Sequence, residues 1–183
     1  MLFGNKESFA IECIIDPAAQ FRHYTRGTIS LWFGNQQIGN GNETVALDIP
    51  VAELKNITNK QNIRRDVSAE FLDKDTDEIL NEVYDHIYSY DVDEQELAEL
   101  KRISDRYSVI QMITPSLTGP PFDGWLVLII DLPKHERIVW RKWISEWEEF
   151  ESHACLIEEG EYERVVGVFT NWYNHCKNRT DKT

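Results

Sequence analysis

One stretch does most to decide the fold of this chain: Gly27-Thr28-Ile29-Ser30-Leu31-Trp32-Phe33. From Ile29 onward every second residue is a core-type apolar residue, which is the period of a β-strand with one buried face. Gly34-Asn35 is then a typical hairpin turn, and Gln36–Gly39 follows as the return strand. The stretch therefore predicts an antiparallel hairpin.

The segments on either side extend this hairpin into a sheet. Phe9–Ile15 is short, apolar and β-rich, and it closes at Asp16-Pro17. Thr44–Ile49 has the character of another strand and ends at Pro50. Together these segments predict an antiparallel meander. Val51–Asn62 is too polar to predict more than a short helix.

The second half of the chain returns to strands and closes with a helix. Four segments are predicted strands: Ser108–Ile113, Gly124–Leu132, Glu136–Arg141 and His153–Ile157. The last element has apolar residues at helical spacing, which predicts an amphipathic helix laid across the sheet. Its apolar residues are Tyr162, Val165, Val166, Phe169, Trp172, Tyr173 and Cys176.

These patterns predict the α+β class: an antiparallel meander sheet packed by a C-terminal amphipathic helix, with an acidic helical segment in the middle. A length of 183 residues and the lack of internal repeats suit a single domain over 1–183. The polar tail over 177–183 is expected to fray.

The middle of the chain carries almost all of the negative charge. The chain has 32 acidic and 19 basic residues and a net charge of −13. Residues 66–99 hold thirteen acids and one base, Lys74, a net charge of −12 that leaves −1 for the rest. Such an acidic chain is a poor match for nucleic acid or an anionic membrane, so neither is expected as a partner.

The acidic segment, 66–105, is predicted to form helices. Asp75-Thr76-Asp77-Glu78 resembles a capping box with acids at the positive end of the helix dipole. One helix follows this box, and a second is predicted over Asp93–Asp105. The residues expected to face inward are Ile79, Leu80, Val83, Ile87, Leu97, Leu100 and Ile103.

The outward side of the first acidic helix is the candidate binding surface. Concentrated charge steers a basic partner, and tyrosine beside charge is enriched at binding hot spots. The plainer interpretation is a solvated face that keeps the protein soluble, with tyrosines that only cap the core. The candidate partner-binding residues are Asp73, Asp75, Asp77, Glu78, Glu82, Tyr84, Asp85 and Tyr88.

Composition and motifs argue against several other classes of protein. The longest uninterrupted apolar run, Trp125–Ile130, is too short to span a bilayer. Three scattered cysteines predict reduced thiols in a cytoplasmic protein. Asp73–Asp77 opens like a calcium loop, but Glu78 stands where that loop needs glycine. His153 and Cys155 lack the paired spacing of a zinc site. We expect no metal, no cofactor and no enzyme activity.

Short motifs at the two ends of the chain resemble a known family. They are Met1-Leu2-Phe3-Gly4-Asn5 with Phe9–Glu12, the strand from Gly27 to Gly39, Gly124-Trp125, the strand around Glu136–Trp140, and the closing aromatic helix. This pattern is similar to bacterial immunity protein family 42, and it leaves the acidic middle unmatched. The resemblance implies a cytoplasmic antidote of a polymorphic toxin system, which binds a cognate toxin domain and blocks it. It supplies no site residues.

Charge and resemblance together predict stoichiometric inhibition of a basic, nuclease-like toxin domain through the acidic surface. Two alternatives stay open. A generic acidic binding module or nucleic-acid mimic would bind several basic partners about equally. An enzyme with residues converging from distant segments would need a pocket holding a titratable pair with perturbed pKa values.

Overall fold

The computed structural model describes residues 1–17, 25–88, 94–113, 120–142 and 151–180. Within helices and strands, the side chains of residues 86–88, 94–100, 113, 120, 179 and 180 lie outside this description. The elements in chain order are β1 (Leu2–Gly4), β2 (Phe9–Ile15), β3 (Arg26–Phe33), β4 (Gln36–Ile38), β5 (Val45–Ala46), α1 (Asp48–Asn59), α2 (Gln61–Ser68), the 3-10 helix η1 (Ala69–Phe71), α3 (Thr76–Tyr88), α4 (Glu94–Tyr107), β6 (Gln111–Ile113), the 3-10 helix η2 (Pro120–Phe122), β7 (Trp125–Leu132), β8 (His135–Lys142), β9 (Ser152–Glu158) and α6 (Glu161–Thr180).

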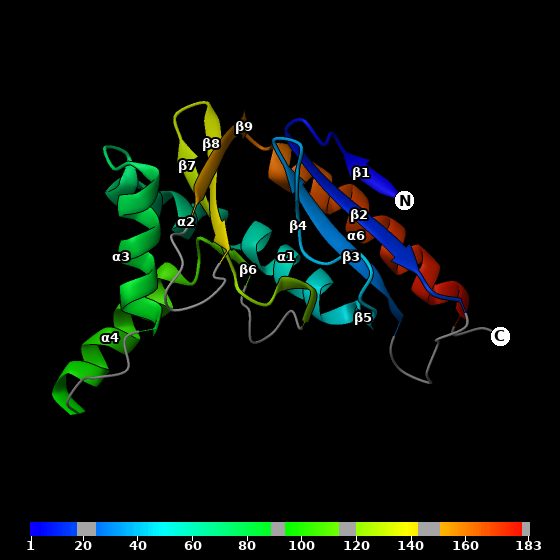
Figure 1. Ribbon diagram of the computed structural model, residues 1–183, viewed down its shortest axis with the longest axis horizontal. Helices are drawn as coiled ribbons and strands as arrows, with labels where there is room; N and C mark the ends of the chain where they lie inside the picture. Colours follow the sequence, from blue (N-terminus) through cyan, green and yellow to red (C-terminus); the bar gives the residue numbers. More distant parts are fainter. Residues whose placement is uncertain (18–24, 89–93, 114–119, 143–150, 181–183) are drawn as a thin grey trace.

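The strands form two antiparallel sheets (Figure 1). The first sheet has the order β1-β2-β3-β4, with β5 also paired to β3, and the second has the order β6-β7-β8-β9. The α+β class is confirmed, but the expected meander is divided in two. Strands β1–β5 pair with one another and strands β6–β9 pair with one another, and the stretch from α1 to α4 lies between the two sets in the chain.

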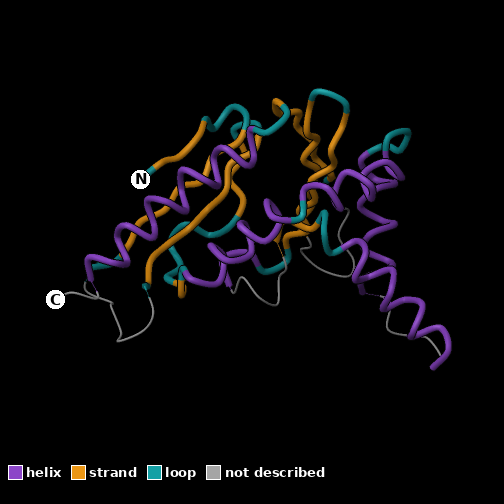
Figure 2. Tube along the Cα trace, turned by 180° about the vertical axis from the view of Figure 1, so that it is seen from behind, coloured by secondary structure: helices purple, strands orange, loops and turns teal. Residues whose placement is uncertain are grey.

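The first sheet packs one face against α6. Alternate residues of its strands, such as Phe9, Ile11 and Leu31, are buried in a core with Tyr162 and Phe169 of α6. Figure 2 shows α6 running lengthwise over this face of the sheet. The other residues of the same strands point to the opposite face, because side chains alternate along a strand. We call that opposite face the open face. No described helix lies over it (Figure 1).

The second sheet is covered on both sides. Val127 and Ile129 of β7 belong to the same core as the first sheet and α6. Leu126 and Leu128, the alternating residues of the same strand, belong to a second core. The partners of that second core on α3 are Ile79, Leu80 and Val83, all fully buried as the helical period predicts. Because both cores include β7, the second sheet joins the two halves of the molecule.

A buried ion cluster fastens α2 to this framework. Arg64 of α2 is fully buried and donates two 2.8 Å hydrogen bonds to Asp131 of β7. It also contacts Glu136 of β8 at 3.2 Å and Glu163 of α6 at 2.9 Å. Glu136 in turn accepts a 3.2 Å hydrogen bond from the backbone N–H of Tyr162. Four elements thus meet at one guanidinium.

Several predicted boundaries are corrected by the structure. The strand predicted over Thr44–Ile49 is reduced to Val45–Ala46, and α1 begins at Asp48. Pro50 does not end a strand; it lies in the first turn of α1, where a helix needs no N–H donor. The strand predicted over Ser108–Ile113 is reduced to Gln111–Ile113, since the chain before it is still turning out of α4.

Two further differences occur at the ends of the chain. β1 was not predicted, yet it pairs with β2 and buries Phe3 in the core. α6 continues to Thr180, so the first residues of the tail expected to fray from residue 177 are helical. Lys177 is held there by an ion pair with Asp48 of α1. Residues 181–183 lie outside the described ranges.

Candidate functional site

The acidic residues singled out in the sequence lie on α3 and the turn before it. α3 presses Ile79, Leu80 and Val83 into the second core, so its opposite side faces solvent. We call this side the acidic face and define it by its six acids: Asp73, Asp75, Asp77, Glu78, Glu82 and Asp85. All of these except the partly buried Glu82 are exposed. Figure 1 shows α3 against the second sheet, with α4 running away from the body beside it.

Two acids of this face hold the helix start. The backbone N–H of Asp75 donates to the Glu78 side chain at 2.8 Å, and the N–H of Glu78 donates to the Asp75 side chain at 2.9 Å. This reciprocal pair is the predicted capping box. Part of the hydrogen-bonding capacity of these two carboxylates therefore serves the fold.

Glu82 also has a structural role. It forms an ion pair with Lys74 and accepts a 3.1 Å hydrogen bond from the hydroxyl of Tyr107 at the end of α4. Burial raises the pKa of Tyr107, and the bond to Glu82 adds to the rise. Glu82 thus links α3 to α4.

Of the two candidate tyrosines, the structure describes the side chain of one. Tyr84 is partly buried and packs against the second core, which fits the boundary position that its spacing predicts. The side chain of Tyr88 lies outside the described residues, as do those of Ile87, Leu97 and Leu100.

Asp77 and Asp85 lie near a base of the second sheet. Burial lowers the pKa of Arg141 on β8, while the charges of Asp77 and Asp85 oppose that shift. The guanidinium of Arg141 also donates a 2.8 Å hydrogen bond to Asn81 of α3. Of the six acids of the acidic face, Asp75 and Glu78 form the capping box and Glu82 links α3 to α4. The other three, all exposed, are Asp73, Asp77 and Asp85.

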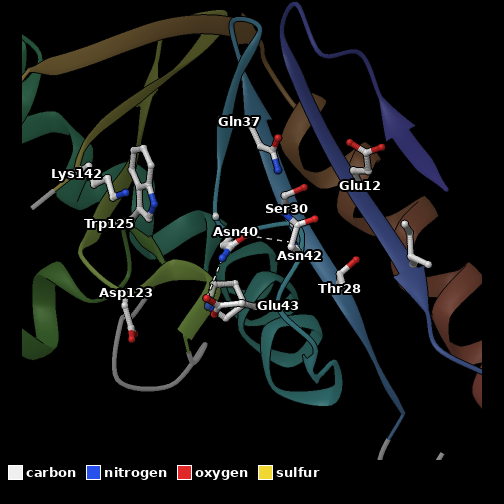
Figure 3. Close-up of a pocket in the computed structure, with 14 residues that line it drawn as sticks. Glu12, Thr28, Ser30, Gln37, Asn40, Asn42, Glu43, Asp123, Trp125 and Lys142 are labelled. Atoms are coloured by element: carbon white, nitrogen blue, oxygen red, sulfur yellow. Dashed lines mark hydrogen bonds between the residues drawn. The ribbon is translucent and has the colours of Figure 1, made fainter. Parts of the chain in front are cut away.

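A second candidate site is a polar pocket of about 690 Å³ between the two sheets (Figure 3). Residues of the open face, among them Thr28, Ser30 and Gln37, line one side of it. Trp125 at the start of β7 and Lys142 at the end of β8 line the other side. The remaining lining residues are Glu12, Ile14, Gly39, Asn40, Gly41, Asn42, Glu43, Pro121 and Asp123.

The loop that borders this pocket is fixed by its own contacts. Gly39 has a φ of +93°, and a Cβ atom there would come within 2.7 Å of the Phe122 ring. The N–H of Asn40 donates to the carbonyl of Pro121 at 2.8 Å. The Asn40 side chain also donates to Glu43 at 2.8 Å. These contacts join the wall contributed by the first sheet to the wall contributed by residues 120–125.

The carboxylates of the pocket differ in how well they are paired. Glu12 accepts 2.9 Å hydrogen bonds from Lys6 and from the indole of Trp32, and the bond from Lys6 is the main reason why its pKa is lowered. In Glu43, the Oε2 atom is buried and has no hydrogen-bond partner among the described residues. Lys142 lies over the ring of Trp125, with Nζ 5.5 Å from the ring centroid.

Sequence reasoning missed this pocket completely. None of the eight predicted site residues lines it, and its lining comes from segments between Glu12 and Lys142 that no local pattern connects. The glycines and asparagines of residues 39–43 were the available signal, but on sequence alone Gly39-Asn40-Gly41 is an ordinary turn.

Possible metal ligands and the cysteine thiols can be assessed within the described ranges. No group of three or more His, Cys, Asp or Glu side chains in the described ranges could hold a metal ion. Burial raises the pKa values of the Cys13 and Cys155 thiols to about 12, which keeps both protonated at neutral pH. The described helices include none with both the length and the apolar character needed to cross a bilayer.

Fold and surfaces together define a class: an α+β protein of two antiparallel sheets with a strongly acidic helix on its surface and a polar pocket between the sheets. The comparison with known families makes this specific. Residues 1–172 match the family described as Immunity protein 42, and the chain belongs to that family. The family match extends through the acidic middle, which the short sequence motifs had left unmatched.

A solved structure has the same fold. The crystal structure of CdiI from Burkholderia dolosa AUO158 superimposes with a TM-score of 0.66 at 14% sequence identity, covering 92% of this chain and 97% of that chain. At this identity the likeness extends to the fold alone. A search among curated proteins gives no match.

Proposed function

We propose that this immunity protein neutralises a cognate bacterial toxin domain by binding it stoichiometrically and covering its functional site, without chemistry of its own. The proposed place of action is the cytoplasm, where the three free thiols would stay reduced. Membership of the immunity protein 42 family supports this function. The toxin is proposed to be basic and nuclease-like, because a basic cleft is what a concentrated acidic surface complements.

One observation supports the acidic face as the toxin-binding surface. α3 is anchored through Ile79, Leu80 and Val83, so its acidic face is held in a fixed direction and not on a loose arm. Arg137 of β8 adds to this anchoring, with hydrogen bonds of 3.0 Å to the carbonyl of Lys74 and 2.6 Å to the hydroxyl of Thr76. A fixed cluster of like charge steers an oppositely charged partner during encounter.

Within the acidic face, Asp73, Asp77 and Asp85 are proposed to make the main contribution. Asp75 and Glu78 are hydrogen-bonded in the capping box, and Glu82 is paired with Lys74, whereas Asp77 and Asp85 are exposed and act on Arg141 through their charges. Exposed charges act mainly on the association rate, and salt screens them over about 8 Å at physiological ionic strength.

The test begins with identification of the partner. The tagged protein is used to capture proteins from its native bacterium at low and then moderate salt, and each captured domain is expressed in cells with and without this protein. Neutralisation predicts that one captured domain arrests growth and that co-expression restores it. Capture of many basic proteins that all dissociate in salt would favour the generic acidic module instead.

The surface is tested with charge reversals against the purified toxin domain. Asp73→Lys, Asp77→Lys and Asp85→Lys together should slow association roughly tenfold or more at low salt, with a smaller difference at high salt. The control reverses Glu7, Asp105 and Glu158, three exposed acids outside the acidic face. Equal association rates for the two triple variants would place the interface elsewhere while leaving the neutralising function intact.

A further inference from the structure

The open face of the first sheet has the composition of a contact surface. Leu2 and Ile14 on this face are 46% and 59% exposed, and Trp32 is partly buried, with the Nζ atom of Lys6 3.5 Å from its ring centroid. Polar residues such as Thr28 and Gln37 lie among them. Aromatic and apolar side chains set among polar ones are typical of surfaces that another protein covers.

The pocket between the sheets opens on this same face. The open face and the pocket lining share Glu12, Thr28 and Gln37, which are labelled in Figure 3. They also share Ile14. A protein that covered the open face would therefore also close the pocket, and a side chain projecting from it would enter the cavity.

The lining of the pocket favours a positive charge. It includes three carboxylates, from Glu12, Glu43 and Asp123, and one ammonium group, that of Lys142. Glu12 is balanced by Lys6, which lies 2.9 Å away. Lys142 is directed at the Trp125 ring. The buried Oε2 atom of Glu43 has no hydrogen-bond partner among the described residues. A buried carboxylate oxygen without a donor is costly, and an incoming cationic donor would relieve that cost.

We propose that the open face of the first sheet is a second contact surface for the toxin, and that an arginine side chain of the toxin occupies the pocket beside Glu43 and Asp123. This inference rests on the proposed function. A guanidinium offers five N–H donors in a rigid plane, which suits a cavity lined by carboxylates and by side-chain amides such as Gln37 and Asn42. Arginine is also enriched among the residues that dominate binding energy at protein interfaces.

The pocket is already built in the free protein. The Gly39 contact with Phe122 and the hydrogen bond from Asn40 to Pro121 hold its two walls together. On binding, the Glu43 carboxylate must turn to present its buried Oε2 atom, but the walls of the pocket are already fixed, and preorganised sites lose less affinity to ordering costs.

The test uses the purified toxin domain and two substitutions that each remove a negative charge, Glu43→Gln with Asp123→Asn. Loss of a desolvated charge pair acts mainly on dissociation, so we expect dissociation to be roughly tenfold faster at both low and moderate salt. Association should stay within about twofold of the parent protein, unlike the acidic-face reversals. The matched control, Glu7→Gln with Glu158→Gln, removes two exposed carboxylates outside the pocket and should leave dissociation unchanged. Circular dichroism checks that each variant is folded.

The occupant is identified with a double-mutant cycle. Each surface arginine and lysine of the toxin is changed to alanine, and one arginine is expected to lose its effect when Glu43 is already glutamine. Coupling to a lysine, or to no basic residue, would overturn the assignment of arginine. Unchanged dissociation of the pocket variant would overturn the second surface altogether. If the parent protein neutralises no captured domain, the proposed function itself fails, which is a separate outcome.

Discussion

Arg64 combines a permanent charge with complete burial. Its guanidinium contacts Asp131, Glu136 and Glu163, and burial alone would lower its pKa, but the bonds to Asp131 and the neighbouring carboxylates outweigh burial and raise it. Removing one member of a buried ion cluster leaves uncompensated charge, which costs more than the pairing contributes. We expect Arg64→Met to lower the free energy of unfolding by about 3 to 5 kcal/mol, measured by urea denaturation.

The neighbouring residue Arg65 provides the control. It contacts Glu159 at 2.6 Å, but the two side chains are 48% and 50% exposed. Solvent screens such a pair, so Arg65→Met should cost less than about 1 kcal/mol. A similar small loss for both variants would mean that the buried cluster contributes no more than a surface pair.

Glu136 gives the same cluster a pH dependence. Burial raises the pKa of Glu136 to about 8, with the charge of Glu163 adding to the rise and Arg64 opposing it. Between the ordinary value of 4.5 and this value, the folded protein keeps a proton that the unfolded chain releases. This group therefore stabilises the fold most at low pH, and its contribution is lost as the pH rises toward 8.

The expected result is a free energy of unfolding that falls as the pH rises from about 5 to about 8. The variant Glu136→Gln cannot titrate and should show a flatter slope over the same range, because only the contribution of this group is removed. Urea denaturation of both proteins across that range checks the difference. Parallel slopes would contradict a raised pKa of Glu136.

At the scale of elements, the start of α3 depends on its capping box. Asp75→Ala removes the acceptor of the Glu78 N–H and should lower the free energy of unfolding by about 1 kcal/mol. The control is Asp77→Ala in the first turn of the same helix, which removes a favourable charge at the dipole and should cost about 0.5 kcal/mol or less. Thermal unfolding of the two variants is the measurement, and equal losses would argue against a specific capping bond.

Elements whose apolar residues recur with a clear period were predictable from the sequence, and elements without such a period were not. β3 and α6 follow apolar periods of two and 3.6 residues, because each buries one face in the core. α2 shows no such stripe: its buried residues include Arg64 and Ser68, whose partners lie on β7 and on elements further along the chain. The short strand β5 and the start of α1 were mistaken for one strand, because the turn between them leaves no local signal beyond Pro50.

At the scale of the whole molecule, the shared second sheet couples the two cores. Because β7 contributes Leu128 to one core and Ile129 to the other, neither core can lose its packing without exposing the sheet. We expect one cooperative transition in urea, with coincident midpoints by tryptophan fluorescence and far-ultraviolet circular dichroism. Leu80→Ala in the second core should move both midpoints together, through a loss of about 2 to 5 kcal/mol.

The exposed Leu72 is the control for that substitution. Its side chain is 47% exposed in the turn before α3, so Leu72→Ala should leave the midpoint almost unchanged. Separate midpoints for the two probes in the Leu80 variant would show that the second core unfolds on its own.

The sequence by itself determined the class of fold, the position of most strands, the closing helix, the capping box and the location of the negative charge. These depend on local spacing and on charge counts, which a linear chain displays directly. The division into two sheets, the Arg64 cluster and the pocket between the sheets were decided only by the tertiary structure. Each brings together residues far apart in the chain. Glu43 and Asp123, for example, line the same pocket because of tertiary packing and not because of a local preference.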